Sequence, residues 1–107
     1  MIAAVAAALG TDATLVVAEA DCTPGTVIDS VRAARAGDAV VLLLLPAVVA
    51  IERAMLLAAV GPLAHELAPR RIGAIDVAES ASADRVVAAA CFLAGAQSTT
   101  GQVLRVA

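Results

Sequence analysis

The chain has 107 residues, a formal net charge of −3, a hydrophobic fraction of 62% and a charged fraction of 16%. This length fits one domain, and so large an apolar fraction excludes a disordered chain. The basic residues are all arginine and are scattered along the sequence, and Phe92 is the one aromatic residue. A nucleic-acid surface needs a basic face or stacking aromatics, so we expect no nucleic-acid partner.

The longest uncharged run, residues 39–51, is interrupted by Pro46 and falls short of the ~20 residues that span a bilayer. We therefore expect no membrane span. The apolar N-terminus has no basic residue before it, unlike a secretory signal. Cys22 and Cys91 lie far apart without metal-ligand spacing, which predicts reduced cysteines, no metal and a cytoplasmic protein. Cys22 is interpreted as an inert turn residue, and Cys91, beside Phe92, as part of the packed interior.

The first half of the chain alternates helix and strand signals. Residues 2–9 predict an alanine-rich helix that ends at Gly10, and residues 14–18 predict a short buried strand. After a turn at 21–25, Thr23 is the expected N-cap of a helix that runs through residues 26–35 and stops at Gly37, with Pro24 at its first position. Residues 39–45 (AVVLLLL) predict a strand covered on both faces.

The second half continues the alternation. Residues 47–68 predict a long helix that Gly61 and Pro62 kink or divide. Residues 72–78 predict a third strand, Ser82 the N-cap of a helix over 83–95, and residues 102–106 the last strand. The order predicts an α/β fold: a small parallel sheet of about four strands with helices on both faces. Periodicity leaves the spatial order of the strands open.

Two stretches resemble the short-chain dehydrogenase/reductase family. LAHELAPRRIGAIDVAES (63–80) resembles the end of the family's catalytic helix and the strand after it, and ADRVVAAACFLAGAQSTTGQVLRVA (83–107) resembles its last helix and strand. The resemblance is best over residues 47–107. These residues are similar to 3-oxoacyl-ACP reductase-type sequences, and the resemblance implies a partial Rossmann-like fold. We therefore identify residues 1–107 as a single truncated domain similar to this family.

The departures from the family pattern concern its chemistry. The family's GxxxGxG cofactor turn has no counterpart in the sequence. By the resemblance, the catalytic lysine position falls on Arg53 and the tyrosine position on Val49, and the loop that carries the serine is missing. We therefore expect no catalytic residue, no cofactor-binding residue and no bound cofactor. The chain is predicted not to be an enzyme on its own; as part of one, it would belong to an NAD(P)-dependent oxidoreductase.

Other polar residues are given ordinary interpretations. We expect Arg53 to be a solvated helix residue next to Glu52, and His65 an exposed helix residue without a second ligand. Glu19, Asp21 and Asp76 follow or end strands, where α/β sheets place their sites. They predict no metal site, because the basic partner that such sites commonly use, a lysine, is absent.

The resemblance implies an assembly role, since the family's subunits contact each other through the helix and the final segment that this sequence keeps. We expect a non-catalytic pseudo-dehydrogenase of bacterial composition that forms a homo-oligomer or a heteromer with a full-length dehydrogenase. The alternatives are a component of a composite active site whose cofactor and tyrosine come from a partner, and a module that binds a small molecule or acyl group. The expected interface residues are apolar: Leu56, Ala59, Leu63, Leu67, Phe92 and Val103.

Overall fold

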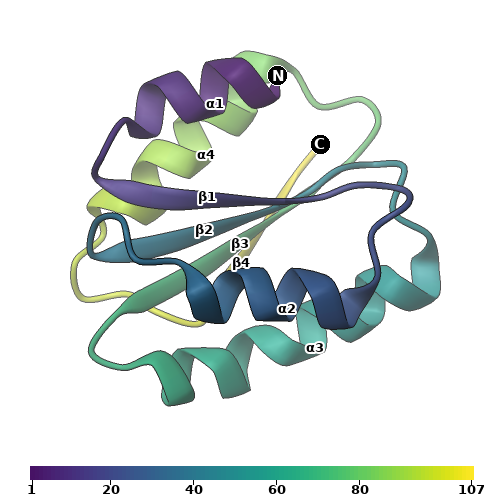
Figure 1. Ribbon diagram of the computed structural model, residues 1–107. Helices are drawn as coiled ribbons and strands as arrows, with labels where there is room; N and C mark the ends of the chain where they lie inside the picture. Colours follow the sequence, from purple (N-terminus) through teal and green to yellow (C-terminus); the bar gives the residue numbers. More distant parts are fainter.

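The computed structural model describes residues 1–107 and contains four helices and four strands that alternate along the chain (Figure 1). Every element that the sequence predicts is present, with bounds that differ by one to three residues at several ends. In chain order the elements are α1 (Ile2–Leu9), β1 (Ala13–Ala18), α2 (Pro24–Ala33), β2 (Ala39–Leu44), α3 (Ala50–Leu67), β3 (Arg71–Val77), α4 (Ala83–Gly95) and β4 (Gln102–Val106).

The strands form one parallel sheet in the order β1-β2-β3-β4, which leaves β1 and β4 at its two edges. Every residue of β2 is buried, as its uninterrupted apolar sequence predicts. The predicted α/β class with a parallel four-stranded sheet is therefore confirmed. The strand order follows the chain, since each helix returns the chain to the next position in the sheet.

Helices cover both faces of the sheet, α1 and α4 on one and α2 and α3 on the other (Figure 1). Alternate residues of each strand point to opposite faces. Val40, Leu42 and Leu44 of β2 pack with α2 and α3, while Val41 and Leu43 pack with α1 and α4. The two resulting cores are built almost wholly from Ala, Val, Leu and Ile. No helix is long and apolar enough to cross a membrane.

The helix ends follow the predicted capping chemistry. The hydroxyl oxygen of Thr23 accepts a hydrogen bond from the Thr26 amide, with Pro24 at the first position of α2, and the Ser82 hydroxyl oxygen accepts one from the Arg85 amide at the start of α4. These side chains satisfy amide groups that have no partner within the helix.

Helix α3 differs from the prediction in two respects. It begins at Ala50 instead of residue 47, and it is one continuous helix through Pro62, which does not divide it. Pro62 is on the exposed side, where the carbonyl that loses its partner can bond to water. Leu56, Val60 and Leu63 are buried on the opposite side, and their packing holds both halves against the sheet.

Candidate functional site

A buried carboxylate between two arginines lies at the carboxyl edge of the sheet. Asp76 of β3 is 6% exposed and is the one buried charged residue. Its Oδ1 accepts a hydrogen bond from Arg53 of α3, and its Oδ2 accepts one of 3.0 Å from Arg105 of β4. Arg53 also donates to the carbonyl oxygen of Leu45, directly after β2. The cluster therefore joins the middle of the sheet to the first turns of α3.

The expectation that Arg53 is a solvated helix residue is wrong. Only 17% of its side chain is exposed, because the guanidinium group turns inward to Asp76 instead of outward to water. Asp76 and Arg105 are neighbours in the register of β3 and β4. One signal in the sequence could have indicated this cluster: β3 and β4 are largely apolar, yet each contains a charged residue near its end, Asp76 and Arg105. Pairing these two residues requires the strand order.

This cluster borders a shallow hollow of about 230 Å³ and offers little acid–base chemistry. Both carboxylate oxygens of Asp76 accept hydrogen bonds from arginine, and an arginine side chain stays protonated in proteins. A general base must lie within reach of the proton that it removes, and Asp76, only 6% exposed behind its arginine partners, offers its remaining lone pairs little access to a substrate. The lining residues are Pro46, Arg53, Asp76, Val77, Ala78, Glu79 and Arg105.

The remaining acidic residues near the strand ends do not join the cluster. Glu19 and Asp21 are exposed after β1, which is separated from β3 by the whole of β2. His65 is exposed on α3, as predicted. No three His, Cys, Asp or Glu side chains come together in a group that could hold a metal ion.

A family model of short-chain dehydrogenase-like proteins matches residues 13–106, from the first residue of β1 to the last of β4. The chain belongs to this family. No curated protein and no solved structure matches it. The match covers all four strands and the three helices between them, and leaves α1 outside.

The resemblance described above implies that Val49 and Arg53 stand at the positions of the family's tyrosine and lysine. Val49 is 51% exposed and apolar. The guanidinium group of Arg53 bonds to Asp76 and to the carbonyl oxygen of Leu45. A guanidinium group held by two acceptors is not chemically interchangeable with the ammonium group of a lysine.

The structure separates the six expected interface residues into three pairs by their exposure. Leu56 and Leu63 are 2% and 4% exposed and belong to the chain's own core, so they offer almost no surface to a partner. Ala59 and Leu67 are partly buried against the same core. Phe92 and Val103 are 54% and 40% exposed on α4 and β4. An apolar surface that the prediction missed lies on α3 and just before it, at Val49, Ile51 and Met55.

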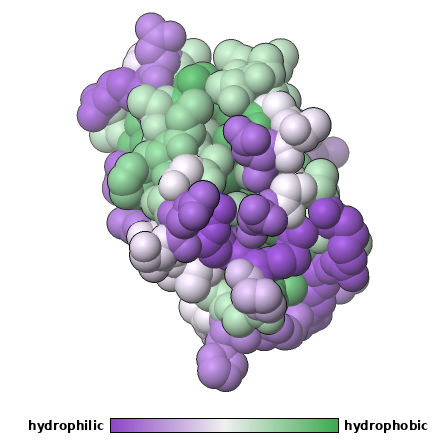
Figure 2. Space-filling model, turned by 90° about the vertical axis from the view of Figure 1, so that its left-hand side faces the viewer, coloured by the Kyte–Doolittle hydropathy of each residue, from purple (hydrophilic) through white to green (hydrophobic).

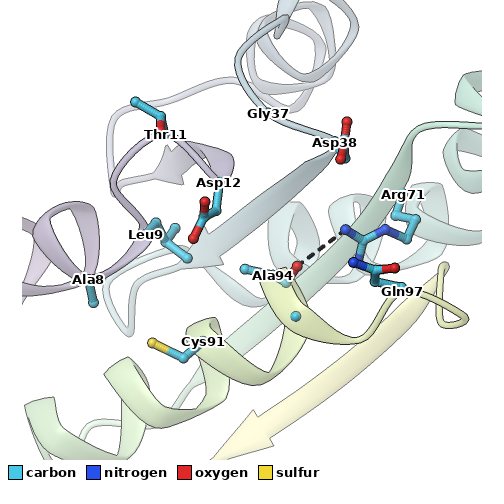
Figure 3. Close-up of a pocket in the computed structure, with 11 residues that line it drawn as sticks. Ala8, Leu9, Thr11, Asp12, Gly37, Asp38, Arg71, Cys91, Ala94 and Gln97 are labelled. Carbon is cyan, nitrogen blue, oxygen red and sulfur yellow. Dashed lines mark hydrogen bonds between the residues drawn. The ribbon is translucent and has the colours of Figure 1, made fainter.

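A second hollow, of about 430 Å³, lies at the amino edge of the sheet. Figure 3 places Leu9 and Asp12 on one side of it and Arg71 and Gln97 on the other. Arg71 donates hydrogen bonds to the carbonyl oxygens of Ala94 and Ala96, which close the last turn of α4. Its charge therefore serves the helix end, where cations are stabilising.

Cys91 also lines this amino-edge hollow, and the prediction that it packs in the interior is wrong. Its side chain is exposed because Val86, Ala90 and Leu93 form the inner face of α4 and Cys91 falls outside it. Figure 2 views this end of the molecule, where hydrophobic side chains gather over the upper part and hydrophilic ones over the lower part. A one-sided apolar surface of this kind is typical of a contact region.

Proposed function

We propose that the chain is a non-catalytic dehydrogenase-like subunit that acts by assembly, with itself or with a full-length short-chain dehydrogenase. The observation that carries this proposal is the state of Arg53. At the position of the family lysine, its guanidinium group bonds to Asp76 and Leu45, and the sequence contains neither tyrosine nor lysine. The residues that remain stabilise the sheet edge and leave no proton donor or acceptor arranged for hydride chemistry.

The exposed side of α3 is the first contact surface in this proposal. Ile51, Met55 and Ala58 are spaced by four and three residues, so they share one side of the helix, opposite Leu56 and Leu63. Ile51 is 71% exposed and Met55 54%. Large apolar side chains that stand in water on adjacent turns are stabilised when a partner covers them.

The second contact region lies at the β4 side of the sheet, with Phe92 of α4 on one face and Val103 of β4 directed to the other. Phe92 is the one aromatic residue in the molecule, and it is more than half exposed. Ala88 and Gly95, which share its side of α4, are exposed and small, so a partner could approach the helix closely around the ring. Aromatic side chains are enriched in protein interfaces.

Light scattering on the purified chain tests the α3 surface. We expect an oligomer whose mass falls in Ile51→Arg and Met55→Arg, because a charge is then placed in an apolar contact. Ala33→Arg is the matched control, since Ala33 is exposed at the end of the neighbouring helix α2. The proposal is contradicted if all three variants have the same mass as the wild-type chain and the wild-type chain does not bind a purified full-length dehydrogenase.

Calorimetry with NADPH tests the non-catalytic part. Protein fluorescence is unsuitable because the chain has no Trp and no Tyr. We expect no saturable heat of binding for the isolated chain. Tight stoichiometric binding of NADPH would contradict the non-catalytic part of the proposal. The assembly part would still be tested by the substitutions in the contact surfaces.

The composite-site alternative rests on one feature, the exposure of Arg105. Its side chain is 66% exposed although it bonds to Asp76, and with Glu79 it borders the carboxyl-edge hollow. A partner's active site could therefore use this charge. If an active heteromer keeps its full turnover after Arg105→Gln, the alternative fails; a fall in turnover with unchanged assembly favours it.

A further inference from the structure

A third hollow, of about 300 Å³, lies at the amino edge of the sheet, where β2 and β3 begin. It adjoins the hollow of Figure 3, because Asp38, Arg71 and Gln97 line both. Its lining is mainly charged and polar, and consists of Asp38, Pro69, Arg70, Arg71 and Gln97. None of these residues belongs to the carboxyl-edge cluster or to the proposed contact surfaces, so the proposed function does not account for them.

The guanidinium group of Arg70 is held in place but lacks part of its hydrogen bonding. Its Nη1 donates to the carbonyl oxygens of Gly37 at 2.8 Å and Arg35 at 3.2 Å. Its Nη2 is buried and has no partner, and no protein group accepts from its Nε. Exposed arginines such as Arg35 can bond their free N–H groups to water. A buried donor without an acceptor is costly, more so on a charged group, so Arg70 needs an acceptor from outside the chain.

The free side of Arg70 has the geometry that recognises a carboxylate. The Nε–H and Nη2–H groups of an arginine form a planar fork that matches the two oxygens of a carboxylate. Arg32 shows the same fork in use, because its Nε and Nη2 donate bonds of 2.8 and 3.1 Å to the two carboxylate oxygens of Glu66. The corresponding fork of Arg70 is already fixed by its carbonyl contacts, so binding a ligand costs little side-chain ordering.

The charge of the hollow favours an anion. Arg70 and Arg71 are both partly buried, and neither forms an ion pair with a carboxylate of the chain. Arg71 bonds to the carbonyl oxygens of Ala94 and Ala96, which keeps its positive charge beside the hollow. Asp38 is the one negative side chain of the lining and is exposed, so water screens its repulsion. Two arginines and one aspartate leave a single net positive charge.

We propose that this hollow binds a small monocarboxylate anion on the fork of Arg70. One carboxylate oxygen accepts from Nε and the other from Nη2, and the charge of Arg71 adds to the attraction. The single negative charge of the ligand matches the net charge of the lining. The inference goes beyond the proposed function, because the exposed side of α3, Phe92 and Val103 take no part in it.

NMR of arginine Nε–H groups during a titration with sodium acetate tests the site on the wild-type chain. Acetate replaces chloride at constant ionic strength, so that general screening stays unchanged. We expect a saturable shift of the Arg70 signal and none of the Arg85 signal, because Arg85 is exposed and its free N–H groups reach water. Arg70 without a saturable shift, or shifts of equal size at both arginines, overturn the inference and mean that acetate is an adventitious ion only.

Two variants, titrated through the side-chain amide signals of Gln97, identify the group that binds. Arg70→Lys keeps the charge and removes the fork, so it should weaken acetate binding by about tenfold, as the loss of a hydrogen bond to a charged group does. Asp38→Asn removes the repelling charge and should bind acetate more tightly than the wild type. An unchanged affinity in Arg70→Lys overturns the inference. Acetate binding that occurs only in Asp38→Asn also overturns it, and means that Asp38 itself supplies the acceptor for Arg70.

Discussion

Arg53 and Asp76 form an ion pair between α3 and β3 in which 17% and 9% of the two side chains remain exposed. The pair is reinforced from both sides, because Arg53 also donates to the Leu45 carbonyl and Arg105 holds the second oxygen of Asp76 at 3.0 Å. Charged groups are costly to bury unless each finds partners. These contacts therefore connect α3, β3 and β4 at the carboxyl edge of the sheet, the edge at which open α/β sheets place their ligand sites.

Arg53→Ala should destabilise the fold strongly, because it leaves the buried Asp76 carboxylate with Arg105 alone. Removing one partner of a buried ion pair typically costs about 3–5 kcal/mol, and we expect about 3 kcal/mol since one partner stays. The free energy of unfolding in urea measures the effect. Arg85→Ala is the control, because the Arg85 side chain bonds only to the Ala107 carbonyl oxygen and both residues are exposed. Equal losses in the two variants would contradict this account of Arg53.

The sequence was sufficient for the elements and insufficient for this joint. Apolar runs such as residues 39–45 and caps such as Thr23 and Ser82 are local signals, so they predicted strands and helices in the right order. Asp76 meets residues 23 and 29 positions away in the chain, and such a meeting depends on strand order and register. The hydrophobic periodicity of the sequence contains no information about strand order or register. Arg53 considered alone is therefore interpreted as a solvated residue, because solvent is the usual place for an isolated charge.

The prediction for Cys91 on α4 was wrong for a related reason. Val86, Ala90 and Leu93 form its buried side, but the apolar sequence around Cys91 and Phe92 gives no contrast to mark it. When a helix is apolar on most sides, the position of the sheet decides which side is inner. The surplus apolar residues then become contact surface.

Gly37→Ala should destabilise the fold because the turn before β2 has no room for a side chain. Gly37 has φ of +70°, and a Cβ there would lie 2.2 Å from the Asp12 carbonyl oxygen. Left-handed backbone at a non-glycine residue costs about 1–3 kcal/mol, and the contact adds to it. Thermal unfolding measures the loss.

Gly25→Ala is the matched control for Gly37→Ala. Gly25 lies in the first turn of α2 with nothing within 4 Å of a Cβ. Alanine should raise the stability there by about 0.4–1 kcal/mol, because it restricts the unfolded chain. If both alanine variants unfold at the same temperature, crowding around position 37 is not the reason why this position requires glycine.

Glu66 should titrate at lower pH than an ordinary glutamate. Arg32 donates hydrogen bonds of 2.8 and 3.1 Å to its two carboxylate oxygens, which lowers the pKa of Glu66. A carboxyl group whose pKa is lowered by folding stabilises the fold above its unfolded pKa, about 4.3, and loses that contribution as the pH falls through its folded pKa. Because both side chains are about half exposed, solvent screens most of this stabilisation.

An NMR titration of the Glu66 carboxyl carbon checks this expectation. Arg32→Ala should raise the pKa of Glu66 to its ordinary value and remove its contribution to the acid side of the stability curve. Arg35→Ala is the control, since Arg35 bonds to the carbonyls of Arg32 and Ala34 instead. An unchanged pKa in Arg32→Ala would mean that the ion pair does not persist in solution.

Leu56 and Met55 are adjacent on α3 and should respond to alanine in opposite ways. Leu56 is 2% exposed within the core, and Met55 is 54% exposed on the outer side. Leu56→Ala leaves a cavity and should cost about 2–5 kcal/mol in the free energy of unfolding. Met55→Ala should change the stability of an isolated subunit by no more than about 0.5 kcal/mol. In an assembled protein, however, it removes a contact, so it should weaken association at constant subunit stability. Measuring the free energy of unfolding and the dissociation constant for both variants therefore separates core residues from interface residues. If Met55→Ala associates as tightly as the wild type, the outer side of α3 stays in water.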